Sequence, residues 1–80
     1  MHAAKLEKSD RLQRTLKVLK TGGWHSTLDI TINAQTTCAS TNVAELRENG
    51  ITILTKREKR GRSTIWLYKW VPEVQLELPI

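Results

Sequence analysis

Residues 43–70 read VAELRENGITILTKREKRGRSTIWLYKW, and the apolar pattern of this stretch changes period at Asn49-Gly50. Around its start, Ala39, Val43 and Leu46 recur at i, i+4 and i+7, which is the spacing of one helical face. Asn-Gly is also a hairpin signal, but after these residues a helix that ends in glycine is the better interpretation. The sequence therefore predicts that a helix ends at this dipeptide.

The segment after this helix predicts a β-hairpin. From residue 51 the side chains follow a period of two, over residues 51–56 and again over residues 64–70. The segment between them, residues 58–63, is polar, basic and contains a glycine. Such a segment between two alternating runs is typical of a hairpin loop, so we expect two antiparallel strands with a basic tip.

A first helix is predicted to begin after the N-cap residues Ser9 and Asp10. Gly22-Gly23 ends it, because glycine readily adopts the left-handed conformation after a last turn. Its apolar stripe consists of Leu12, Leu16 and Leu19. The cations at its other positions, which we interpret as a solvated face, are Arg11, Arg14, Lys17 and Lys20.

The pattern of residues 27–33 is ambiguous. Ser26 with Asp29 fits a capping motif that precedes a helix. However, Leu28, Ile30 and Ile32 alternate with polar residues, which favours a strand. On local pattern alone the two structures are almost equally supported.

The order helix, short strand, helix, turn, helix and hairpin resembles the winged helix-turn-helix superfamily. Residues 43–51 resemble that superfamily's passage from recognition helix to wing, and also small bacterial and phage helix-turn-helix domains with an L-R-x-x-G-I ending. The resemblance covers residues 9–70 and favours a helix over residues 27–33. The turn over residues 34–37 departs from it, because this turn lacks the glycine that many members carry.

The resemblance implies an α+β fold with three helices, a two- to three-stranded antiparallel sheet and possibly an extra C-terminal strand. We expect a flexible basic arm at residues 1–8, the winged domain at 9–70 and a tail at 71–80, which is a possible strand or docking segment. The 80 residues suffice for one compact domain.

The composition points to a polyanionic partner. The chain has 13 Lys and Arg against 8 Asp and Glu, a formal charge of +5. No apolar run is long enough to span a bilayer and no signal peptide opens the chain, so we expect a cytoplasmic location and no membrane. Cys38 is the single cysteine and His2 is isolated from it, so we predict no disulfide, metal or cofactor.

A catalytic role is not expected. Ser26, His25 and Asp29 contain the residue types of a hydrolase triad. Nothing in their spacing indicates a nucleophile elbow or an oxyanion loop, so the sequence predicts a protein that is not an enzyme.

The basic hairpin is the first candidate DNA-binding element. Cations so close together can neutralise phosphates and release counterions, and arginines can also enter a minor groove. A solubilising loop is the alternative. The cations concerned are Lys56, Arg57, Lys59, Arg60 and Arg62.

The third helix, predicted to begin near Thr37, is the candidate reader of base edges. If its apolar stripe faces inward, its outward face exposes the residues Thr37, Ser40, Thr41, Ala44, Glu45 and Glu48. Asn42 lies on one flank and can pair with adenine if the helix is rolled, whereas Arg47 can reach phosphate from the other. An ordinary solvated surface is the alternative, and the two glutamates count against deep insertion at the C-terminal end.

The tail carries a second candidate interface. The strand over residues 64–70 is apolar on both faces, and three helices can cover only one. After Pro72 the tail again alternates, so it can fold back on its own sheet or add a strand to a partner or second copy. Its apolar residues are Val74, Leu76, Leu78 and Ile80. The alternative is a frayed terminus.

These features together predict a bacterial or phage regulator of transcription that binds double-stranded DNA. Its third helix would enter the major groove, and its wing would contact the backbone or the minor groove. Two alternatives remain, a winged-helix module that binds proteins and an excisionase-like accessory factor of recombination. RNA or Z-form DNA is a third possible ligand.

Overall fold

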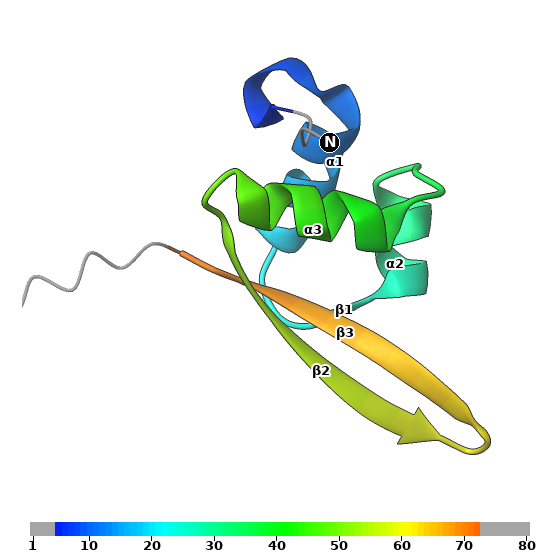
Figure 1. The fold of residues 1–80 in the computed structure, drawn as a ribbon. Coiled ribbons are helices and arrows are strands. Elements are labelled where there is room, and N and C mark those ends of the chain that lie inside the picture. Colours follow the sequence, from blue (N-terminus) through cyan, green and yellow to red (C-terminus); the bar gives the residue numbers. More distant parts are fainter. Residues whose placement is uncertain (1–4, 73–80) are drawn as a thin grey trace, which may run out of the picture.

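The computed structural model describes residues 5–72 and has an α+β architecture (Figure 1). The elements in chain order are a 3-10 helix η1 (Leu6–Lys8), α1 (Asp10–Leu19), β1 (His25–Ser26), α2 (Thr27–Asn33), α3 (Ala39–Glu48), β2 (Thr52–Arg60) and β3 (Ser63–Val71). Three α-helices thus accompany a three-stranded antiparallel sheet of order β1-β3-β2 in the described part. This arrangement is compatible with a winged helix. None of the helices within residues 5–72 has the length and apolarity to cross a membrane.

The hairpin of β2 and β3 extends far beyond the helices, with its turn at the free end of the projection (Figure 1). Its register runs from Thr52 opposite Val71 to Arg60 opposite Ser63. The short strand β1 covers only a small part of the other side of β3, where His25 lies opposite Tyr68. The outer half of the hairpin is therefore a two-stranded ribbon.

The core lies between the helices and one face of the sheet. It contains the predicted stripes of the first and third helices and is completed by residues of α2 and the hairpin. Its members are Leu12, Leu16, Leu19, Ile30, Ala34, Ala39, Val43, Leu46, Ile53 and Tyr68. Leu67 is also buried but is not part of this cluster, because it belongs to the opposite face of β3.

The sequence-encoded caps are present. The Ser9 hydroxyl accepts the Leu12 amide at 3.4 Å, and the Ser26 hydroxyl accepts the Asp29 amide at 3.0 Å. Gly50 has a φ of 87° directly after α3, as expected for a helix that ends in a left-handed residue. The ambiguity over residues 27–33 is resolved as a helix, as the resemblance favoured.

In the turn between α2 and α3, Gln35 adopts the left-handed conformation for which many members of the superfamily use a glycine. This residue has a φ of 51°, the one positive value among the described residues other than glycine. An L-residue pays a steric cost in this conformation. The turn therefore keeps the left-handed geometry without the residue that adopts it most easily.

Two boundaries differ from the sequence-based expectations. Residues 6–8 of the expected arm form η1, because Leu6 packs against the core and its amide donates to Asn49 Oδ1 at 3.0 Å. Helix α3 begins at Ala39 rather than near Thr37, with Cys38 as an N-cap residue whose side chain makes no capping hydrogen bond. The apolar tail residues from Val74 to Ile80 lie outside the described residues.

Candidate nucleic-acid interface

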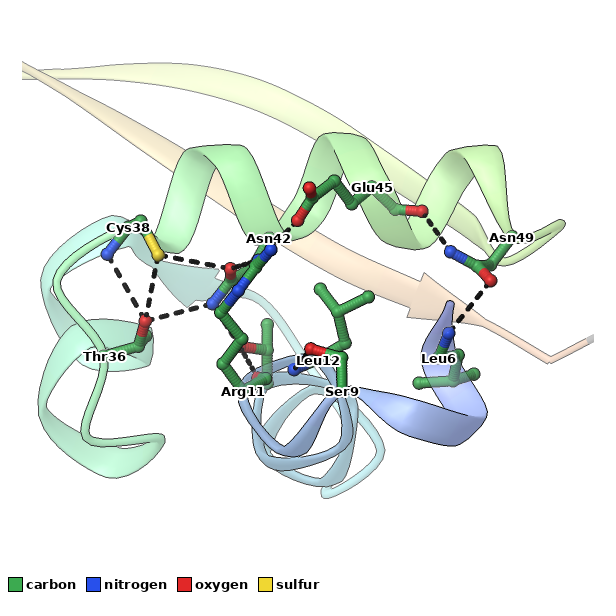
Figure 2. Close-up of polar contacts among 10 residues, drawn as sticks. Leu6, Ser9, Arg11, Leu12, Thr36, Cys38, Asn42, Glu45 and Asn49 are labelled. Carbon is green, nitrogen blue, oxygen red and sulfur yellow. Dashed lines mark hydrogen bonds and ion pairs between the residues drawn. The ribbon is translucent and has the colours of Figure 1, made fainter. Parts of the chain in front are cut away.

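The side of α3 that faces α1 is closed by a buried polar network around Asn42 (Figure 2). Asn42 is 0% exposed, and its amide nitrogen donates to Thr15 Oγ1 at 3.0 Å and to Thr36 Oγ1 at 3.1 Å. Its carbonyl oxygen accepts from Arg11 and from the Cys38 thiol. The prediction that Asn42 contacts a base is therefore wrong, because every polar atom of the amide is bound inside the fold.

The neighbouring residue Glu45 also belongs to this side. Its carboxylate pairs with the Arg11 guanidinium of α1, and the two side chains are only 18% and 34% exposed. The hydrogen bond that Arg11 donates to Glu45 raises the pKa of Arg11, so this guanidinium stays charged. Arg11 is thus a link between helices rather than part of a solvated face, and Glu45 is turned away from the surface where it would repel phosphates.

Arg14 shows the same departure from the solvated-face interpretation. Its Nε donates to the Ala34 carbonyl at 2.8 Å, and its guanidinium also contacts Gln35 and Asp10. The arginine therefore ties α1 to the turn that precedes α3. Together with the Asn42 network, it fixes the orientation of α3 in the domain.

The opposite side of α3 is open to solvent. Ser40, Thr41 and Ala44 are exposed there, as predicted, and Thr37 is exposed just before the helix begins. These side chains are short, so a ligand surface can approach the helix backbone closely. Glu48 is the exposed carboxylate at the far end of the same side.

Arg47 joins α3 to the hairpin. Its guanidinium donates to the Ile53 carbonyl of β2, from Nε at 3.2 Å and from the terminal nitrogen at 2.7 Å, and it also contacts Thr55 Oγ1. The residue is exposed, but its donors are directed at the wing. It holds the wing beside the helix, which is a role that the sequence did not indicate.

The alternation of strand residues divides the hairpin cations between two faces. Ile53 and Tyr68 face the helices. Arg57 and Lys59 lie on the same face of β2 as Ile53, because they follow it at alternate positions further out along the strand. Arg57 stacks on Trp66, its cross-strand neighbour, with 5.6 Å between guanidinium and ring centroid. On this face Arg57 and Lys59 are the cations of β2, whereas Arg60 is the wing cation that borders a cleft with Ser40 of α3.

The other hairpin cations are placed differently. Lys56 lies on the opposite face, with its Nζ 4.4 Å from the ring centroid of Trp24. Arg60 pairs with Glu58 at 3.2 Å near the end of the ribbon, and Arg62 lies in the turn. The structure therefore does not gather all five predicted cations on one surface.

Three exposed apolar residues near this region were missed as site candidates. Trp66 is 46% exposed on the wing, and Leu28 is 67% exposed at the start of α2. Both border a cleft with Ser40 of α3. Trp24, 37% exposed, lies on the opposite face of the sheet. The periodicity of the sequence did not show which of the tryptophans would reach the surface.

The group of Ser26, His25 and Asp29 is structural. His25 Nδ1 contacts the Asp29 carboxylate at 2.5 Å, and Nε2 lies 3.0 Å from the Gly22 carbonyl. The Ser26 hydroxyl caps α2 instead of facing the imidazole. Within residues 5–72, no three side chains of His, Cys, Asp or Glu come together as metal ligands.

Comparison of the chain with known protein families, with curated proteins and with solved structures finds no match.

Proposed function

We propose that this protein is a winged helix-turn-helix domain that binds double-stranded DNA and regulates transcription. The short side chains on the open side of α3 enter the major groove, and Arg57 and Lys59 of the wing contact the neighbouring backbone. One observation carries the proposal: a single cleft is bordered by Ser40 at the start of α3 and by Thr64 and Trp66 of the outer hairpin. The open side of α3 and the cationic ribbon thus form one continuous surface.

The charge distribution supports a phosphate-bearing ligand. Residues 52–71 carry six Lys and Arg, namely Lys56, Arg57, Lys59, Arg60, Arg62 and Lys69, against the single carboxylate of Glu58. Glu45 is engaged by Arg11 on the other side of α3, so it adds little repulsion at the open side. Cations that project from a rigid ribbon can follow a phosphate backbone, and each contact releases counterions.

The proposal is tested by the salt dependence of duplex binding for two double variants. Arg57→Ala with Lys59→Ala removes two cations from the α3 side of the wing. Lys8→Ala with Lys17→Ala removes the same charge from exposed positions in η1 and α1, outside the wing. Fluorescence anisotropy with a labelled duplex, repeated over a salt series, measures both affinity and slope.

We expect the wing variant to weaken binding and to reduce the slope of log affinity against log salt by about 0.9 for each lost contact. The control variant should keep a slope close to that of the unaltered protein. If both variants behave alike, the wing does not carry the contact. If the unaltered protein binds no duplex at low salt, the proposed function is wrong.

One observation favours a second function, a protein-binding module. Leu28 and Ile32 are 67% and 64% exposed, and they lie one helical turn apart on α2. An exposed apolar pair on a short helix is a common contact for a protein partner. Absence of duplex binding at low salt, together with self-association that Ile32→Gln abolishes, would favour this function.

A further inference from the structure

The cleft between α2, α3 and β3 lies beside the outer hairpin, where β1 no longer covers the edge of β3. Its volume is about 500 Å³. The apolar part of its wall is formed by Leu28, Ile65 and Trp66, and polar groups come from Ser40, Thr64 and Arg60. A site that binds a small, flat, polar molecule or group typically has an apolar wall with a few hydroxyls and a cation, as this cleft has.

Trp66 is the main feature of this wall. Its indole is 46% exposed, although Arg57 stacks on it with 5.6 Å between guanidinium and ring centroid. Arg57 is its cross-strand neighbour on a two-stranded ribbon, so the ring is held by the backbone register rather than by a flexible loop. The indole is thus pre-positioned as a stacking platform beside the open side of α3.

Resting on the proposed function, we infer that this cleft holds one unpaired nucleobase of a DNA strand, stacked on Trp66. In the interior of a paired duplex the neighbouring base pairs cover both faces of each base, so away from the duplex ends the indole finds a base to stack on only where one is unpaired. The hydroxyls of Ser40 and Thr64 can meet the polar edge of that base, and Arg60 can meet its phosphate. The preferred ligand is therefore a duplex with an adjoining single-stranded or bulged nucleotide.

Charge favours a nucleotide over an apolar peptide in this cleft. The outer ribbon carries Arg57, Lys59, Arg60 and Arg62. Its one carboxylate, Glu58, already pairs with Arg60 at 3.2 Å. An apolar peptide would leave Arg57, Lys59 and Arg62 without counter-charge, whereas a nucleotide offers an aromatic face and a phosphate together.

The test compares a blunt duplex with the same duplex carrying a single-stranded overhang, at one fixed salt concentration. A fluorescent adenine analogue at the first unpaired position reports stacking through its quenching. The protein variants are Trp66→Ala, Trp66→Phe and Trp24→Ala. The last is a matched control, because Trp24 is also exposed but lies on the other face of the sheet. Thermal unfolding shows that each variant is folded.

We expect the unaltered protein to bind the overhang duplex roughly ten-fold tighter than the blunt one, within the about 5- to 150-fold that stacking of one base provides. Trp66→Ala should abolish this preference and the quenching, because its affinity for the overhang duplex should fall by more than its affinity for the blunt duplex. Trp66→Phe should keep part of both, and Trp24→Ala should keep them fully.

Equal affinity for the two duplexes, with salt-dependent binding of both, would overturn the inference and leave the proposed function intact. An equal loss for both duplexes in Trp66→Ala would also overturn it, because the ring would then touch a paired strand. Absence of binding to either duplex would refute both the proposed function and this inference.

Discussion

The two sides of α3 are built in opposite ways. Toward α1, the polar groups of Asn42 and Glu45 are bound inside the fold by Thr15, Thr36 and Arg11. Toward solvent, the helix presents the short side chains of Ser40, Thr41 and Ala44 beside a cationic ribbon, with Glu48 at the far end. Buried polar groups with all partners present specify a unique arrangement, so the closed side fixes where the open side points. The residues that orient α3 are therefore distinct from those proposed to contact a ligand.

The largest effect is expected on the closed side. Asn42→Ala removes the amide that donates to the hydroxyls of Thr15 and Thr36, and it leaves Arg11 with one acceptor fewer. Buried polar groups without partners are costly, so the free energy of unfolding should fall by about 2–3 kcal/mol. For a domain of this size the midpoint of thermal unfolding should drop by roughly 10–20 °C. A change within experimental error would show that the network does not stabilise the fold.

An effect on binding alone is expected on the open side. Ala44→Glu places a carboxylate where α3 would meet phosphates, and the site is exposed. DNA affinity should fall by roughly ten-fold through like-charge repulsion, while unfolding free energy changes by less than about 0.5 kcal/mol. Ile32→Glu adds the same charge to exposed α2 and serves as the control. Equal losses in both variants would contradict the division between the two sides.

Arg47 joins α3 to the hairpin. Its removal should therefore loosen the wing, with a smaller loss of stability than Asn42→Ala causes. Arg47→Ala removes the donors to the Ile53 carbonyl and to Thr55 that hold β2 beside α3. The residue is exposed, so we expect a loss of about 1 kcal/mol in urea unfolding. Arg47→Lys should recover little of this, because an ammonium cannot reproduce the two-nitrogen contact. Full recovery by lysine would mean that charge alone matters here.

The smallest effect concerns the turn that leads into α3. Gln35→Gly relieves the left-handed strain at a φ of 51°. The gain is partly offset by the greater freedom of glycine in the unfolded chain, so we expect a net stabilisation of about 0.5 kcal/mol. Gln35→Ala is the control and should give no gain. Destabilisation by glycine would indicate that the Gln35 side chain contributes more than its backbone conformation costs.

Much of the fold could be predicted from the sequence because its signals are local. Ser9, Ser26 and Gly50 mark helix ends, and the change of period after α3 marks the hairpin. Residues 27–33 were ambiguous for a physical reason: of their three strand-like apolar residues, only Ile30 is buried, whereas Leu28 and Ile32 are exposed. A periodicity argument assumes that apolar residues face the core, and here two of three do not.

The candidate site was only partly predictable, because its arrangement depends on contacts between distant segments. Asn42 lies three residues after Ala39 and four before Leu46, so its spacing placed it on the inward side. Its polarity argued for the surface, and only its partners on α1 and on the turn before α3 allow the amide to be buried. Likewise, the sorting of Lys56 and Arg57 onto opposite faces follows from the register of the hairpin.

The central claim is that the open side of α3 and the adjoining wing form one DNA-binding surface. The most direct measurement is an NMR titration of amide shifts with a blunt duplex of arbitrary sequence, at low and moderate salt. The account predicts shifts at Ser40, Thr41, Ala44 and residues 57–62 that weaken as salt rises, with little change at Thr15 and Asn42. Shifts confined to other surfaces, or none at low salt where nonspecific binding is strongest, would contradict it.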